Sequence, residues 1–177
     1  MIKRASYDES CLRLRELGLL AHDEVPLLPA RRPRYDDDQP WGLNFFRTFI
    51  EGPKDLSNLT LPRTFFGRSE IRDVSFQGTD LRESTLCWND FVAVDFRSAD
   101  LSLSDLRSAC FDDVQFAGAI LRRADLRRSS FAGCRFDSAV MQGAVLTRAQ
   151  ASRMSLSTVQ QAEIDWRDED GEEPGGG

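Results

Sequence analysis

Large apolar residues recur at every fifth position of this chain, in a register that runs without insertion from Leu56 to Leu156. A helix buries every third or fourth residue and a half-buried strand every second, so neither structure explains a step of five. The register consists of Leu56, Leu61, Phe66, Ile71, Phe76, Leu81, Leu86, Phe91, Phe96, Leu101, Leu106, Phe111, Phe116, Leu121, Leu126, Phe131, Phe136, Met141, Leu146, Ala151 and Leu156. Ala151 is its one small member.

A second position, two residues before each large one, is small or apolar, as in Ala99, Ser104, Ala109 and Val114. The resulting motifs include SADLS, RADLR, SSFAG, GTDLR and AGAIL. They resemble the pentapeptide-repeat family, whose consensus is A(D/N)LXX, over residues 54–156. The resemblance implies an all-β fold: a right-handed quadrilateral parallel β-helix with four pentapeptides per coil. About five coils are expected, stacked because a single coil cannot bury its own centre.

Arranging the register in rows of twenty predicts the composition of each side of the square. Two adjacent sides collect leucines, one through Leu81 and Leu101 and the next through Leu86 and Leu106. The other two sides collect mainly phenylalanines, which we expect to stack in columns along the axis.

The ends of the repeat predict caps, because a solenoid exposes its core at both ends. We expect residues 1–53 to supply a helix starting at Asp8 and stopping at Gly18, an extended proline-rich loop, and a lid built from residues 41–52. Residues 157–167 are expected to form a short C-terminal cap that places Val159, Ile164 and Trp166 over the last coil. Residues 168–177 are acidic and glycine-rich, and we expect them to be disordered.

The sequence lacks the motifs of known catalytic chemistry. His22 is the only histidine, the four cysteines contain no CxxC pair, and nucleotide-binding loops and hydrolase motifs are absent. The aspartates that precede the central residues are interpreted as structural. We therefore predict no enzyme activity, no catalytic residue, no cofactor and no metal site. No apolar run is long enough for a membrane span and no secretory signal is present, which favours a cytoplasmic protein without a membrane partner.

The surface is where this chain is expected to act. Residues 54–156 carry 14 basic and 13 acidic residues, so the excess acid of the chain lies mainly in its tail. Arginines nevertheless gather on the two leucine sides, where a tryptophan and a leucine also fall at outward positions; this composition is typical of interface hot spots. The predicted partner-binding residues are Trp88, Leu103, Arg82, Arg107, Arg122, Arg123, Arg127 and Arg128. Two alternatives are a merely solvated arginine surface and a Trp88 covered by a folded-back N-terminal segment. A third alternative is that the acidic tail folds onto these arginines and screens their charge until a partner displaces it.

Three functions are compared. The best-known class in the family protects DNA gyrase from inhibitors by mimicking DNA, which requires a strongly negative rod, whereas this rod is balanced. Nucleic-acid binding through the arginines is disfavoured by the low pI and by the absence of an aromatic stacking platform. The layout also resembles small pentapeptide-repeat proteins thought to act as immunity proteins beside toxins. We therefore predict a bacterial protein-binding module of the immunity or antitoxin type, with gyrase protection and nucleic-acid binding as alternatives. A homodimer through the C-terminal end is a further expectation.

Overall fold

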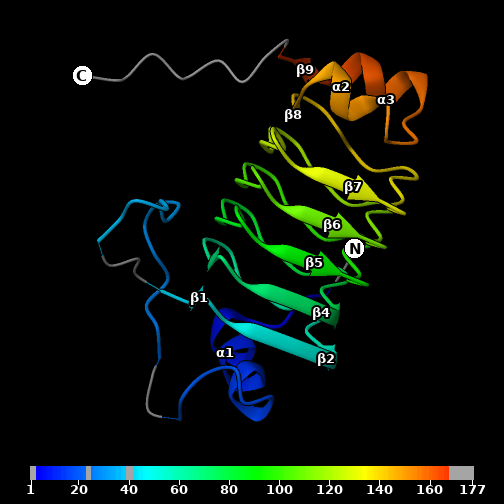
Figure 1. The fold of residues 1–177 in the computed structure, drawn as a ribbon. Helices are drawn as coiled ribbons and strands as arrows, with labels where there is room; N and C mark the ends of the chain where they lie inside the picture. The colour runs from blue at the N-terminus through cyan, green and yellow to red at the C-terminus, as the bar shows by residue number, and fades with distance from the viewer. Residues whose placement is uncertain (1–2, 23–24, 39–41, 168–177) are drawn as a thin grey trace.

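The protein is a parallel β-solenoid of about six turns, with short helical pieces at both ends (Figure 1). The computed structural model describes residues 3–22, 25–38 and 42–167. In chain order its elements are α1 (Tyr7–Glu16), β1 (Asn44–Phe46), β2 (Phe49–Asp55), β3 (Phe65–Gly67), β4 (Glu70–Ser75), β5 (Asp90–Val92), β6 (Cys110–Asp112), β7 (Ser130–Ala132), β8 (Val145–Leu146), α2 (Arg148–Ala151), α3 (Thr158–Glu163) and β9 (Asp165–Trp166). No helix among these is long and apolar enough to cross a bilayer.

All described pairing between coils is parallel; partners lie twenty-one residues apart in β1 and at the start of β2, and twenty residues apart from Lys54 onward. The longest sheet has the order β2-β4-β5-β6-β7, and β1-β3 and β8-β9 form two shorter sheets. On the sides of the square that lack regular strands, the coils are joined by isolated β-bridges, as in the series Thr60, Asp80, Asp100. This architecture is the one that the resemblance to the pentapeptide-repeat family implies, with each pentapeptide supplying one side of a coil.

The inward-facing residues form columns, and the predicted separation into leucine sides and aromatic sides is confirmed. The register residues from Leu56 to Leu146 are buried. On one aromatic side the Phe111 ring stacks between Phe91 and Phe131, with centroids at 5.1 and 5.3 Å. Its neighbour on the adjacent side, Phe116, meets it edge-on at 5.3 Å. Offset stacks along the axis and edge contacts between columns are the arrangements that aromatic rings prefer.

The solenoid begins earlier than the repeat register suggests. β1 and β2 pair with β3 and β4, so that Phe45 lies against Phe66 and Ile50 against Ile71. The segment expected as a lid is therefore an additional coil, and the expected division after residue 53 falls inside β2. The pairing shifts between Glu51 and Lys54, where β2 has one residue more than β4. This coil is therefore offset by one residue from the repeat register. Trp41, which belongs to the expected lid, lies outside the described residues.

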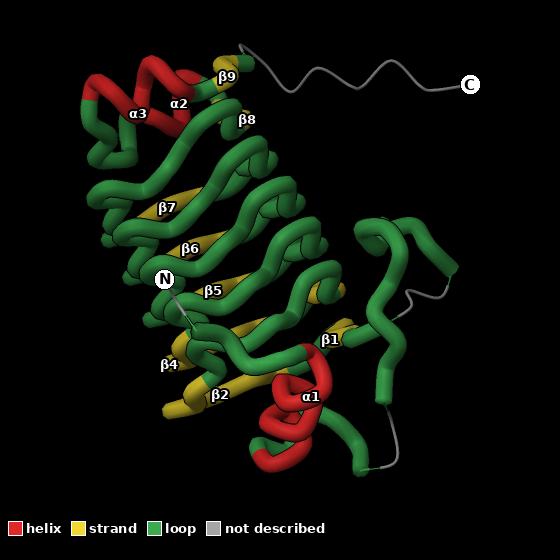
Figure 2. The backbone as a smooth tube through the Cα atoms, turned by 180° about the vertical axis from the view of Figure 1, so that it is seen from behind, coloured by secondary structure: helices red, strands yellow, loops and turns green. Residues whose placement is uncertain are grey.

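Helix α1 closes the N-terminal end of the rod (Figure 2). Its N-cap is Ser6 and not Asp8, because Ser6 and Glu9 form a reciprocal capping box. Cys11 and Leu14 are buried. The Thr60 amide donates a hydrogen bond of 2.8 Å to Ser10 Oγ. The helix therefore covers the first coils with its apolar side and also satisfies their backbone.

The C-terminal end is closed by glutamines and by one further strand. The Gln160 side-chain amide donates hydrogen bonds to the carbonyls of Phe136 and Ala139, at 2.7 and 3.0 Å. The repeat register ends at Leu146, because Ala151 belongs to α2. β9 then places Trp166 beside Leu146, on the same side of the rod.

One expectation about this end is wrong, and another concerns residues that the structure does not describe. Ile164 is buried as expected, but Val159 is 67% exposed and does not cover the core, since the Gln160 side chain occupies that place. The expected disorder of residues 168–177 concerns residues outside those described.

Candidate binding face

The eight residues predicted from the sequence to bind a partner all lie on the two leucine sides of the rod. We call these two sides the leucine-side face. One side presents Arg82 and Arg122, and its corner carries Leu103 and Arg123. The next side presents Arg107 and Arg127, and its far corner carries Trp88 and Arg128. Trp88 and Leu103 are 54% and 41% exposed, whereas Arg127 is half-buried. The pentapeptide register thus brings these residues onto two adjacent sides.

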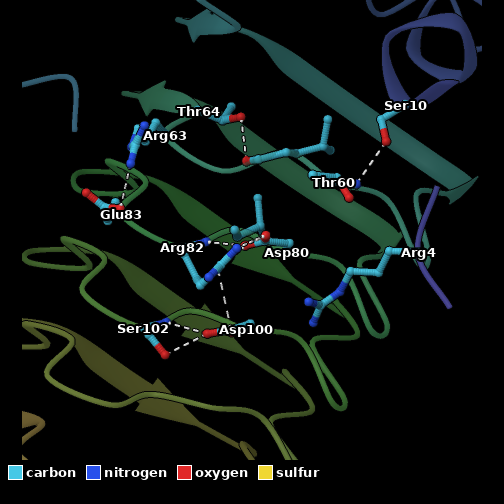
Figure 3. Close-up of polar contacts among 12 residues, drawn as sticks. Arg4, Ser10, Thr60, Arg63, Thr64, Asp80, Arg82, Glu83, Asp100 and Ser102 are labelled. Carbon is cyan, nitrogen blue, oxygen red and sulfur yellow. Dashed lines mark hydrogen bonds and ion pairs between the residues drawn. The ribbon is translucent and has the colours of Figure 1, made fainter. Parts of the chain in front are cut away.

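Three of these arginines are clamped by aspartates of their own pentapeptides. Arg82 donates from Nε and Nη2 to the two carboxylate oxygens of Asp80, at 2.9 and 2.7 Å (Figure 3). Its backbone amide also donates to Asp80 Oδ1, at 3.1 Å. Burial alone would raise the pKa of Asp80, but the hydrogen bonds from Arg82 outweigh it and hold that pKa below its ordinary value. The charge of Arg82 is therefore largely cancelled where it stands.

The same clamp recurs along the rod and links one coil to the next. Arg107 with Asp105 and Arg127 with Asp125 repeat the two-pronged geometry, with closest distances of 2.8 and 2.7 Å. Arg107 Nε also lies 3.8 Å from Asp125 Oδ2 in the following coil. The result is a ladder of alternating charges, which explains the regular Asp–x–Arg spacing.

Arg122 and Arg123 differ from the clamped arginines. Both are exposed, and neither has an ion pair within the part of the chain that the structure describes. Their pentapeptide has Ile120 where the others have aspartate, so the local carboxylate is missing. These two side chains supply positive charge that the rod itself does not neutralise.

Trp88 and Leu103 stand at corners of the coils with a rigid backbone. Both have positive φ angles, of 59° and 60°, in common with most corner residues of the rod. The Trp88 amide donates to the Arg107 carbonyl at 3.1 Å, and the Leu103 amide to the Arg122 carbonyl at 2.9 Å. The backbone that carries the two apolar side chains is therefore fixed before any partner arrives. With Trp88 about half exposed, the alternative that a folded-back segment covers it is not supported.

A proline- and arginine-rich segment from the N-terminal part of the chain folds back onto the lower part of this face, as the alternative above supposes, but it leaves Trp88 exposed. Residues 25–38, which we call the strap, run along the outer side of the first coils (Figure 2). Arg63 Nη1 donates to the Pro29 carbonyl at 2.8 Å, and Arg32 Nη1 donates to the Leu103 carbonyl at 2.9 Å. Thr85 Oγ1 donates to the Pro33 carbonyl. These contacts use backbone carbonyls, which carry no signal in the sequence.

The strap leaves hollows between itself and the coils. One hollow of about 510 Å³ is bounded by strap residues 32–36 together with Asp105 and Arg107. A neighbouring one of about 330 Å³ is lined by Arg31, Arg32, Arg34, Glu83, Leu103 and Arg123. We call the two together the strap cleft, since Arg32 and Arg34 line both. The cleft borders the leucine-side face and is rich in guanidinium groups.

The described residues contain no group of three or more His, Cys, Asp or Glu side chains placed to hold a metal ion. Cys87 lies beside Trp88 but is buried, and burial raises the pKa of its thiol to about 12, so it is a poor nucleophile at neutral pH. His22 is exposed and lies in the segment that follows α1.

Comparisons with known proteins agree with this architecture. The family model for pentapeptide repeats matches eight copies, over residues 55–86, 69–107 and 109–148, which is more than half of the chain. No curated protein matches the sequence. Among solved structures, HetL from the cyanobacterium Nostoc sp. strain PCC 7120, involved in heterocyst differentiation regulation, has a TM-score of 0.55 at 21% identity. The match covers 58% of this chain and 48% of HetL, so it spans about half the length of that protein.

Two further structures are more distant. The pentapeptide repeat protein alr5209, also from Nostoc, has a TM-score of 0.39 at 23% identity, with 64% of this chain and 84% of that one covered. A trypsin-treated form of QnrB1, a plasmid-mediated fluoroquinolone resistance protein, has a TM-score of 0.35 at 17% identity, with 64% and 56% covered.

Proposed function

This chain belongs to the pentapeptide repeat family, and on that premise we propose that it is a non-catalytic, protein-binding rod of the immunity type. It docks on a protein toxin through the leucine-side face and blocks the toxin's working surface. The pentapeptide repeat family is generally non-catalytic, which supports a binding function.

The observation that carries the proposal is the pair of exposed apolar side chains on rigid corners of the leucine-side face, of which Leu103 lies next to the uncompensated Arg122 and Arg123. Trp88 and Leu103 are more than one-third exposed, and a tryptophan with arginine neighbours is the composition that dominates interface energetics. The parallel stack fixes the backbone at both corners, so little backbone entropy is lost when a partner binds. Arg122 and Arg123 add unpaired charge that selects an acidic partner surface.

DNA mimicry is the second candidate, and the charge pattern of the rod argues against it. Mimicry needs an uninterrupted series of negative charges, because duplex DNA presents one about every 1.7 Å along its axis. Here Asp80, Asp105 and Asp125 are each clamped by an arginine two residues later. The carboxylates that repeat along the leucine sides are therefore neutralised within the rod.

The test is a capture experiment from host lysate with the full chain as bait. One variant combines Trp88→Ala, Leu103→Ala and Arg123→Gln. The matched control is Arg97→Gln, which removes an exposed arginine on an aromatic side. We expect one stoichiometric partner on the native chain and on the control, and loss of at least about tenfold on the face variant, equivalent to about 1.4 kcal/mol.

The captured protein is then expressed alone and together with this chain. Growth arrest that the chain relieves supports an immunity function. Recovery of gyrase subunits would support the alternative, and equal recovery on the face variant would refute docking through the leucine-side face.

A further inference from the structure

The strap cleft carries more positive charge than its own lining neutralises. Arg31 is paired with Asp37 at 3.0 Å, Glu83 with Arg63 at 3.1 Å, and Arg107 with Asp105 at 2.8 Å. The unpaired groups of the described lining are the guanidinium groups of Arg32, Arg34 and Arg123, opposed by the single carboxylate of Asp36.

Arg32 illustrates that these guanidinium groups lack a carboxylate partner among the described residues. Its Nη1 donates to the neutral carbonyl of Leu103, at 2.9 Å, although a guanidinium group forms its strongest hydrogen bonds with carboxylates. The cleft has hollows of about 510 and 330 Å³ beside these groups, which is ample space for carboxylate side chains. Its chemistry therefore fits an acidic, extended peptide segment.

The chain contains such a segment directly after Arg167, and Arg167 lies on the same side of the rod as the strap cleft residue Arg107. β9 continues the column of Leu106, Leu126 and Leu146 with Trp166. The Arg167 amide donates to the Leu146 carbonyl at 2.9 Å, so Arg167 lies on the same side as Arg107. The next six residues of the sequence, 168–173, contain five carboxylates and one glycine.

The distance to be covered is short compared with the reach of this segment. Arg167 and Arg107 are three coils apart, and at about 4.8 Å per coil this is about 14 Å along the rod. Six residues extend to about 20 Å at 3.3 to 3.6 Å each. Residues 168–173 can therefore reach the strap cleft without any change in the rod.

We propose that the acidic segment 168–173 runs along the rod into the strap cleft, where its carboxylates pair with Arg123 on the way and with Arg32 and Arg34 at its end. In this state the chain covers one border of its own leucine-side face. Occupancy of the cleft does not depend on the partner proposed above.

The test uses a fluorescein-labelled peptide with the sequence of residues 168–177 as the probe, followed by fluorescence anisotropy. Its target is the full chain in which the five carboxylates are replaced by amides: Asp168→Asn, Glu169→Gln, Asp170→Asn, Glu172→Gln and Glu173→Gln. We expect the probe to bind this tail-neutral chain and to bind the unmodified chain at least about tenfold more weakly. The attached acidic segment competes there at an effective concentration in the millimolar range.

Two variants of the tail-neutral chain locate the site. Arg34→Gln with Arg123→Gln should weaken probe binding about tenfold or more, whereas Arg97→Gln, on an aromatic side, should leave it unchanged. Binding should also fall with added salt. Equal affinity for the tail-neutral and unmodified chains, or full affinity after the Arg34 and Arg123 changes, would overturn the proposal. Since no partner is present, such a result leaves partner docking intact.

Discussion

Replacing Phe111 by leucine should cost more stability than the same change at Phe91, although both side chains are 1% exposed and lie in one column. Phe111→Leu removes ring contacts with Phe91, Phe131 and Phe116. Phe91→Leu removes those with Phe111 and Phe96 only, because its other neighbour in the column is Ile71. At about 1 kcal/mol per ring contact, the expected losses are about 3 and about 2 kcal/mol.

The measurement is the free energy of unfolding from guanidinium titrations, followed by tryptophan fluorescence and by circular dichroism. The two transitions must coincide, since a solenoid can unfold in parts. The expected difference between the variants is about 1 kcal/mol, with Phe111→Leu the less stable. Losses that agree within about 0.3 kcal/mol would show that the aromatic columns act only through buried area, and the reasoning from ring geometry would fail.

Three further predictions concern thiols, acid and the C-terminal cap. At pH 8 a thiol reagent should modify the exposed Cys110 well before the buried Cys87, whose pKa is raised to about 12; mass spectrometry of digested peptides gives the order, and equal rates would contradict it. Asp80→Asn should destabilise the protein by about 1 to 2 kcal/mol at pH 7. Because the pKa of Asp80 lies below its ordinary value of 3.8, its stabilisation is present above that pH and disappears as the pH falls through the folded pKa. The difference in unfolding free energy between native chain and variant should therefore shrink in acid, and a constant difference would contradict it. Gln160→Leu should leave two carbonyls of the last coil without their donor and cost about 1 to 3 kcal/mol in the same titration, whereas exposed Gln161→Leu should cost less.

The periodic part of the fold was predictable because its signal is repeated many times. Each register side chain from Leu56 to Leu146 is buried, as the step of five indicates. The separation into leucine and phenylalanine sides follows once the family resemblance supplies four pentapeptides per coil. The first coil was missed for a local reason. Phe45 and Ile50 are also five apart, but the shift between Glu51 and Lys54 moves them out of register with Leu56.

The candidate site was predictable only in part, because it depends on contacts that are not periodic. The register places all eight predicted residues on two sides, but it does not show that Arg82 is clamped by Asp80 while Arg123 is not. The Asp–x–Arg spacing contains that information, since the pentapeptide of Arg123 has Ile120 in the aspartate position. The strap is held through the carbonyls of Pro29, Pro33 and Leu103 and left no comparable pattern.

The aspartate–arginine clamps also bear on how such a rod can change in length during evolution. Each clamp joins residues two apart, as in Asp105 and Arg107, so a pentapeptide carries its own counter-ion. Duplicating or deleting twenty residues therefore adds or removes each clamp as a whole pair and leaves no clamped aspartate without its arginine. A coil is thus a unit of inheritance as well as of structure: gene rearrangement can extend the rod by one layer while every clamp stays complete.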